Sequence, residues 1–166
     1  MSDDLTDPVA MHCKYWCASY DGTLMPLMIA LHRVYAAKTA RSNAIFARHG
    51  LCPGEFDVLA SLRRSPPPHE LTPSDVQRSV IITSGGLTKI LRQLEVRGLV
   101  TRSTNPADRR IKPIRLSPSA LPMLEQTMQE LIADSGAWIK ELLSDTEINQ
   151  LTALLSKLLN PPPADA

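Results

Sequence analysis

The stretch from Thr83 to Gly98, TSGGLTKILRQLEVRG, decides the fold of this chain. Its apolar residues fall at positions i, i+3, i+4 and i+7, the spacing of one helix face: Leu87, Ile90, Leu91 and Leu94. Gly98 stands where a helix is commonly ended by a residue in the left-handed conformation. The stretch therefore predicts an amphipathic helix that packs one face against a core.

The opposite face of this predicted helix is suited to meet DNA. It carries no acidic residue, and its residues are small or basic: Gly85, Thr88, Lys89 and Arg92. Each glycine in the first turn, Gly85 and Gly86, costs a helix about 0.5–1 kcal/mol relative to alanine. Close approach of the helix N-terminus to bases or phosphates would explain them, because free backbone N–H groups can donate there. A solvated basic face on a core helix is the alternative interpretation.

The residues before this helix predict a shorter helix joined to it by a tight turn. Thr72 is a suitable N-cap, Pro73 suits the first helical position, and Asp75 follows in the first turn. The helix should run to about Val80, which leaves only residues 80–82 for the connection. Two helices joined so closely form a helix-turn-helix.

The residues after the helix predict a small β-wing. Residues 99–102 and 111–116 have the composition of two short strands, and the polar loop 105–110 between them carries turn residues. Residues 70–71 follow the rigid prolines 66–68 and predict a third short strand of the same sheet.

Three runs of sequence carry a family resemblance. They are LTPSDVQRSV (71–80), GGLTKILRQLEVRGLVTR (85–102) and NPADRRIKPIRLS (105–117). They resemble the winged helix-turn-helix of MarR-type transcriptional regulators, in which a leucine-glutamate and glycine-leucine-valine helix end precedes an aspartate-arginine-arginine wing. The resemblance extends over roughly residues 25–159. Two features depart from the family pattern: Pro113 within the second wing strand, where only an edge or a bulge admits it, and Ser119-Ala120, where the family often has a glycine.

The resemblance implies a mainly α fold with a small β-wing. In it, a winged helix-turn-helix lobe is joined to a helical dimerisation base formed by the N- and C-terminal helices. The implied DNA-binding residues are Ser84, Gly85, Gly86, Thr88, Lys89, Arg92, Arg109 and Arg110. We expect Arg110 to enter the minor groove and Asp108 to structure the wing by holding the loop arginines in place.

The distribution of charge favours DNA as a partner more than the total does. The chain has a net charge of +1, yet between Arg78 and Arg115 nine basic residues face only two acidic ones, Glu95 and Asp108. The remaining residues are therefore net acidic. Such segregation is expected when one lobe faces phosphates and the rest does not.

The helices outside the lobe predict a homodimer. Residues 25–49 keep a helical apolar period over a length that exceeds the need of one small lobe. Aliphatic stripes also mark a helix after residues 117–118 and a last helix that opens with the capping box at 144–147. We expect N- and C-terminal helices from two copies to pack together.

The chain divides into four predicted parts. An N-terminal extension with the long first helix covers 1–48, the DNA-binding domain covers 49–117, the C-terminal dimerisation helices cover 118–160, and a proline-rich tail at 161–166 is expected to be disordered. The start of the chain lacks the pattern of a signal peptide, and no segment approaches the length of a membrane span, so we expect a cytoplasmic protein.

The N-terminal extension offers weak functional candidates only. A short helix from Asp7-Pro8 through Tyr20, ended by Asp21-Gly22, would carry Trp16, which resembles a tryptophan in family members that respond to urate-like ligands. Packing is the simpler role for that ring. Cys13 and Cys17 stand at i, i+4, but no second cysteine or histidine cluster supports a metal site. We expect free thiols that are buried or half-buried, and no cofactor.

These observations predict a ligand-responsive transcriptional regulator, most simply a repressor, that binds a pseudo-palindromic operator on double-stranded DNA as a homodimer. The resemblance implies a small aromatic or phenolic acid as the effector. Two alternatives stay open: a winged-helix protein-interaction module without DNA binding, and a redox- or metal-sensing regulator that acts through Cys13 and Cys17. The sequence offers no nucleophile beside a base, no phosphate loop and no paired carboxylates, so we do not expect an enzyme.

Overall fold

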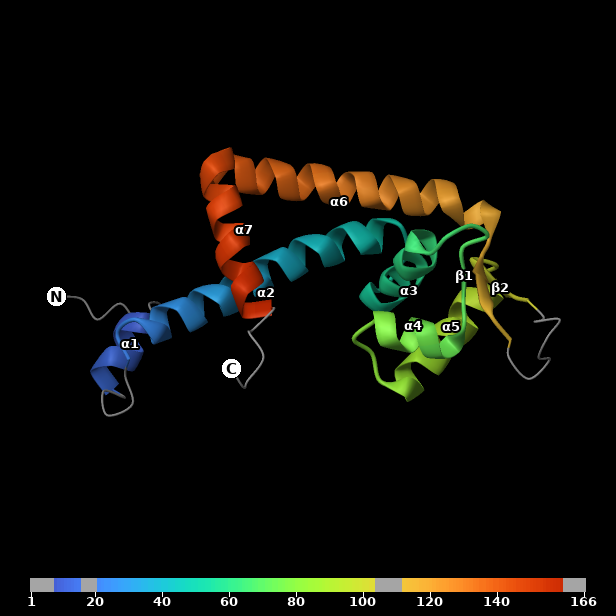
Figure 1. Ribbon diagram of the computed structural model, residues 1–166, viewed down its shortest axis with the longest axis horizontal. Helices are drawn as coiled ribbons and strands as arrows, with labels where there is room; N and C mark the ends of the chain where they lie inside the picture. The colour runs from blue at the N-terminus through green and yellow to red at the C-terminus, as the bar shows by residue number, and fades with distance from the viewer. Residues whose placement is uncertain (1–7, 16–20, 104–111, 160–166) are drawn as a thin grey trace, which may run out of the picture.

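The computed structural model describes residues 8–15, 21–103 and 112–159, and within them the chain is mostly helical (Figure 1). The elements in chain order are α1 (Pro8–Tyr15), α2 (Leu24–Arg48), α3 (Pro53–Arg64), β1 (Glu70–Leu71), α4 (Pro73–Ser79), α5 (Ser84–Val96), β2 (Val100–Arg102), β3 (Ile114–Leu116), the 3-10 turn η2 (Pro118–Ala120), α6 (Leu121–Leu142) and α7 (Asp145–Leu159).

The helix predicted from the opening stretch is confirmed as α5. Thr83 is its N-cap, and the Thr83 hydroxyl oxygen accepts the Gly86 backbone N–H at 3.2 Å. Leu87, Leu91 and Leu94 are buried, as their spacing predicts. The helix is followed by Gly98 at φ +68°, the left-handed conformation that glycine adopts without a steric penalty.

The shorter helix α4 and the turn that follows it are also confirmed. The Thr72 hydroxyl oxygen accepts the Asp75 backbone N–H at 3.2 Å, and the hydroxyl donates to the Asp75 carboxylate at 2.6 Å. That hydrogen bond and the guanidinium of Arg78 hold the pKa of Asp75 below its ordinary value. The side-chain amide of Gln77 donates to the Ile82 carbonyl and so fixes the turn before α5.

The three predicted strands form one antiparallel sheet in the order β1-β3-β2, although the second wing strand is shorter than expected. It spans Ile114–Leu116 instead of 111–116, and residue 111 lies outside the described residues. Pro113 stands just before the strand and not within it, because proline has no N–H to give to a strand ladder. Its carbonyl still accepts the Ser103 N–H at 2.9 Å, which closes the base of the wing.

One hydrophobic core joins α3, α4, α5, the sheet and the start of α6. Its largest fully buried side chains include Leu59, Leu62, Leu94, Ile114 and Leu124. Phe46, near the end of α2, stacks on Phe56 of α3 with ring centroids 4.5 Å apart. The lobe is therefore tied to the end of the long helix by core packing.

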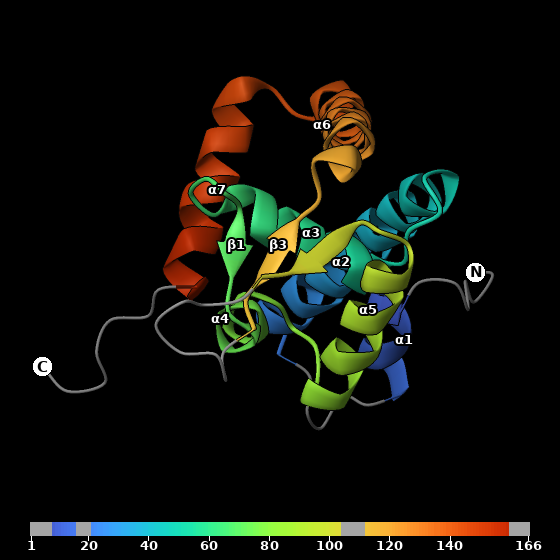
Figure 2. The same cartoon turned by 90° about the vertical axis from the view of Figure 1, so that its right-hand side faces the viewer.

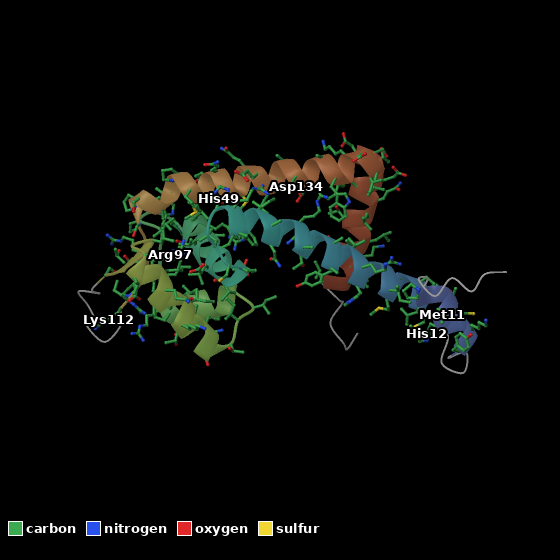
Figure 3. The ribbon with its side chains drawn as sticks, turned by 180° about the vertical axis from the view of Figure 1, so that it is seen from behind. Met11, His12, His49, Arg97, Lys112 and Asp134 are labelled. Atoms are coloured by element: carbon green, nitrogen blue, oxygen red, sulfur yellow. The ribbon has the colours of Figure 1, made fainter. Side chains whose placement is uncertain are left out.

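The helices α2 and α6 run side by side away from the lobe, which Figures 1 and 2 show from two directions. Polar contacts join them along the seam on which His49 and Asp134 lie (Figure 3). Arg41 donates to both carboxylate oxygens of Asp134 at 2.8 Å. Arg48 and His49 contact Glu130 at 2.9 and 3.0 Å, and chiefly the Arg48 hydrogen bond lowers the pKa of Glu130. No local sequence pattern indicated these pairs.

Side-chain hydrogen bonds mark the starts of α7 and α2. The predicted capping box of α7 is confirmed: the Ser144 N–H donates to Glu147 at 2.8 Å, and the Glu147 N–H donates to Ser144 at 3.4 Å. The predicted end of the first helix at Asp21-Gly22 stays a prediction, because residues 16–20 lie outside the described residues. The Asp21 carboxylate accepts the N–H groups of Thr23 and Leu24 at 2.8 Å, at the start of α2. These hydrogen bonds lower the pKa of Asp21. The described part of the first helix ends at Tyr15.

The packing of α5 gives a first testable expectation. Leu94 is fully buried, whereas Val96 on the same helix keeps 82% of its surface exposed. Leu94→Ala should lower the free energy of unfolding by about 2–5 kcal/mol because it leaves a cavity, and Val96→Ala should change it by less than about 0.5 kcal/mol. Urea unfolding of both variants at one protein concentration measures the difference, and equal losses would mean that the assigned buried face is wrong.

Candidate nucleic-acid interface

The outward face of α5 brings together the side chains that the sequence assigned to DNA. Five of these residues are exposed: Ser84, Gly85, Thr88, Lys89 and Arg92. The Thr88 hydroxyl donates to the Ser84 carbonyl at 3.1 Å, which orients it along the helix. Because α5 buries its leucine stripe against α3, this face turns away from the core.

The two glycines of the first turn have different roles. A Cβ at Gly86 would stand 3.0 Å from Ile82 Cγ2 and 3.1 Å from Thr83 Oγ1, so packing inside the chain explains this glycine. A Cβ built at Gly85 would meet no described atom within 4 Å. The expectation of close approach by an outside partner therefore rests on Gly85 alone.

Most arginines of the basic lobe are paired within the chain, which the sequence count did not show. Four pairs bind arginines of the 78–115 segment to a carboxylate: Arg78–Asp75, Arg97–Glu55 at 2.9 Å, Arg102–Glu95 at 2.6 Å and Arg115–Glu70 at 2.8 Å. Three of the acids precede the segment, so a count between its ends omits them. The basic count thus overstates the charge that is free to meet DNA.

Three other cations of the 78–115 segment form no ion pair among the described residues: Lys89, Arg92 and Lys112. All three are exposed. Lys112 lies at the edge of the lobe that points away from α2, where the described chain resumes after the wing loop (Figure 3). The predicted wing residues Asp108, Arg109 and Arg110 lie outside the described residues.

A buried carboxylate holds the far end of α5 in place. Glu55 keeps only 7% of its side chain exposed; one oxygen accepts the Cys52 N–H and the other accepts Arg97 Nη1, both at 2.9 Å. Together these bonds join the start of α3 to the end of α5. Sequence reasoning missed Glu55, although its place three residues after Cys52 is that of a capping-box acid.

A cavity of about 250 Å³ lies between α2, α3 and α6, at the junction of the lobe and the long helices. Its lining combines aromatic and charged groups: Tyr35, Lys38, Phe46, Phe56 and Asp57. Burial raises the pKa of Asp57, which the charges of Lys38 and Arg64 partly oppose. The weak candidate Trp16 lies outside the described residues, so its relation to this cavity stays untested.

The cysteines form no described cluster. Cys13 and Cys52 are free and exposed, so the expectation of buried or half-buried thiols is wrong for these two residues. Cys17 lies outside the described residues. Among the residues described, no group of three histidine, cysteine or acidic side chains could hold a metal ion. Within the described part of the chain, no helix combines the length and the apolar character needed to cross a membrane.

Known proteins resemble this chain both in sequence and in fold. Residues 49–111 match the profile of the MarR family. The HTH-type transcriptional regulator PecS of Dickeya dadantii (strain 3937) is 28% identical over 135 residues, which cover 80% of this chain and 81% of PecS. A structure of a mutant MarR from E. coli complexed with operator DNA has a TM-score of 0.70 at 27% identity and covers 82% of this chain and 96% of that one.

NadR in complex with 4-hydroxyphenylacetate matches the fold with a TM-score of 0.64 at 22% identity, over 87% of this chain and 97% of that one. The fold, the profile over residues 49–111 and the relatives along most of the chain agree: the winged lobe matches the MarR family, and the chain is similar in sequence and fold to MarR-type transcriptional regulators.

Proposed function

We propose that the protein is a ligand-responsive repressor that binds a pseudo-palindromic operator as a homodimer. Each subunit places α5 in the major groove, where Ser84, Thr88, Lys89 and Arg92 meet the DNA, and its wing in the minor groove. Arg110 enters the minor groove, Arg109 is a further DNA-binding residue of the wing, and Asp108 structures the wing.

The observation that carries the proposal is the composition of the exposed face of α5. It presents hydroxyls, two unpaired cations and a glycine open to approach, with no carboxylate among them. Neighbouring arginines are held by carboxylates, so Lys89 and Arg92 are the described cations of α5 that remain available to DNA. A mutant of E. coli MarR, a relative by sequence and fold, has been solved complexed with operator DNA, which supports DNA as the partner.

Exposed apolar surface on the long helices supports the homodimer. None of the residues of α7, all of which are described, is buried in the single chain. Large apolar side chains stand exposed on three helices: Leu27, Met28 and Val34 of α2, Ile132, Ile139 and Leu142 of α6, and Leu151, Leu154 and Leu158 of α7. Monomeric proteins rarely leave so much contiguous apolar surface to water, and a second copy would cover it.

The cavity between α2, α3 and α6 supports the ligand response. Phe46 and Phe56 offer a stacked aromatic wall, and Lys38 offers a cation for a carboxylate. A small aromatic acid fits this chemistry, and NadR, with the same fold, has been solved with one such acid bound. Because the cavity lies where the lobe meets the long helices, a ligand there can change the spacing of the two lobes in a dimer.

The DNA-binding proposal is tested by variants of α5. Arg92→Ala or Lys89→Ala should weaken binding to the specific operator by about 1–3 kcal/mol where the side chain meets a base edge. Binding to random duplex should change much less. Electrophoretic shifts with the promoter region beside its own gene and with random DNA measure both; the absence of any shift for the wild type would favour the interaction-module alternative.

Gly85 gives a test in which stability and DNA binding move in opposite directions. Gly85→Ala should raise the free energy of unfolding by up to about 1 kcal/mol and should weaken operator binding, because the new methyl group blocks close approach. Gly136→Ala in α6 is the matched control, since a Cβ there also meets no described atom within 4 Å. A Gly85→Ala protein with full operator affinity would contradict close approach at this residue.

The ligand site is tested with aromatic carboxylic acids in a thermal-shift screen. An acid that binds the folded protein should raise its melting temperature and release the operator. Lys38→Gln should abolish both effects while operator binding without ligand persists. Arg33→Gln, an exposed α2 residue outside the cavity lining, removes the same charge and should keep the response. Loss of the response in both variants would exclude a specific role for Lys38.

A further inference from the structure

One arginine, Arg102, joins α5 to both chain segments at the base of the wing. Nε of Arg102, at the end of β2, donates to Glu95 Oε1 on α5 at 2.6 Å. Nη1 of the same side chain donates to the Lys112 carbonyl at 3.4 Å. Arg102 precedes the wing loop and Lys112 follows it, so a single guanidinium links α5 to the two chain segments from which the wing leaves the sheet.

The Glu95–Arg102 pair also lies beside the face of α5 that enters DNA. The Arg102 side chain lines a groove between α4, α5 and β2, together with Ser84 and Thr88. Neither side chain of the pair is buried, with 36% of Arg102 and 33% of Glu95 exposed. Exposed pairs of this kind add little to the free energy of unfolding. A gain in stability therefore does not explain why this contact is present.

Glu95 is the acid on α5, and its charge works against DNA binding at long range. A carboxylate in a lobe that meets phosphates repels them, even when a nearby cation offsets part of its field. Replacing it with a neutral residue should therefore tighten binding if electrostatics alone decide. If Glu95 instead positions the wing, the same replacement should weaken DNA binding.

We infer that Glu95 is a positioning residue for DNA binding. Through Arg102 it fixes the direction in which the wing leaves the sheet relative to α5, so that helix and wing reach their grooves together. The pair acts on the angle between two DNA-binding elements and leaves the fold of each unchanged. This inference rests on the proposed function in DNA binding.

The test compares Glu95→Gln with a control that removes the same charge elsewhere. Glu125 of α6 accepts from Arg63 of α3 at 2.6 Å, and both of these side chains are exposed, so Glu125→Gln breaks an equivalent pair outside the DNA-binding face. Glu95→Gln should bind the operator roughly tenfold more weakly, the loss expected for a misplaced groove contact. It should also lose preference for A/T-rich flanks, and its melting temperature should match that of Glu125→Gln.

A double-mutant cycle shows whether Glu95 acts through Arg102. The Glu95→Gln/Arg102→Gln protein should bind the operator no more weakly than Arg102→Gln alone, because the same ion pair cannot be broken twice. Losses that add would overturn the inference, as would a Glu95→Gln protein that binds as tightly as wild type or more tightly. A wild-type protein that binds no duplex at any salt would overturn the proposed function as well.

Discussion

Burial of the leucine stripe of α5 sets the orientation of the groups that this helix contributes to the interface. Leu87, Leu91 and Leu94 pack into the core that α3 and the sheet complete. Helical spacing then leaves Thr88, Lys89 and Arg92 on the outside, and the caps at Thr83 and Gly98 limit the helix to the residues that the interface needs. A slip of one residue would bury a cation, which costs far more than the helix gains. The interface is thus a consequence of packing.

Some arginines of the lobe form ion pairs that hold the fold together, and others are available to bind DNA. Arg97, Arg102 and Arg115 each contact a carboxylate that comes from a different element, and each pair joins two parts of the lobe. Their charges are compensated locally, so they contribute less to the field that reaches phosphates. Within the 78–115 segment, Lys89, Arg92 and Lys112 remain as the described cations available to a partner. A modest net charge is compatible with DNA binding when the free cations are gathered on one face.

Local patterns predicted the elements well, because capping, periodicity and turn residues act over a few positions. Thr72 with Asp75 and Ser144 with Glu147 marked helix starts that the structure confirms. Contacts between distant residues could not be predicted in this way. Arg41 with Asp134, for example, joins helices separated by the whole lobe, and no spacing rule in one sequence links them.

The sequence predicted the parts of the site that depend on local spacing and missed those that depend on tertiary contacts. The outward face of α5 followed from helical periodicity, but the role of each arginine depended on tertiary neighbours such as Glu55 and Glu70. The shorter strand at Ile114–Leu116 has a local cause that the sequence did contain, since Pro113 has no N–H for the ladder. The lining of the cavity between α2, α3 and α6 comes from three segments and appears only once they are packed.

The division between free and paired cations is tested most directly by the salt dependence of operator binding. A substitution that removes one phosphate interaction should reduce the slope of log affinity against log salt by about 0.9. Lys112→Gln, which removes a free cation outside the base-reading face of α5, should therefore reduce the slope of a dimer by nearly twice that amount. The charge-neutral Glu70→Gln/Arg115→Gln protein should keep the wild-type slope. The account would be contradicted if the slope fell as far in this double variant as in Lys112→Gln, or if Lys112→Gln left the slope unchanged.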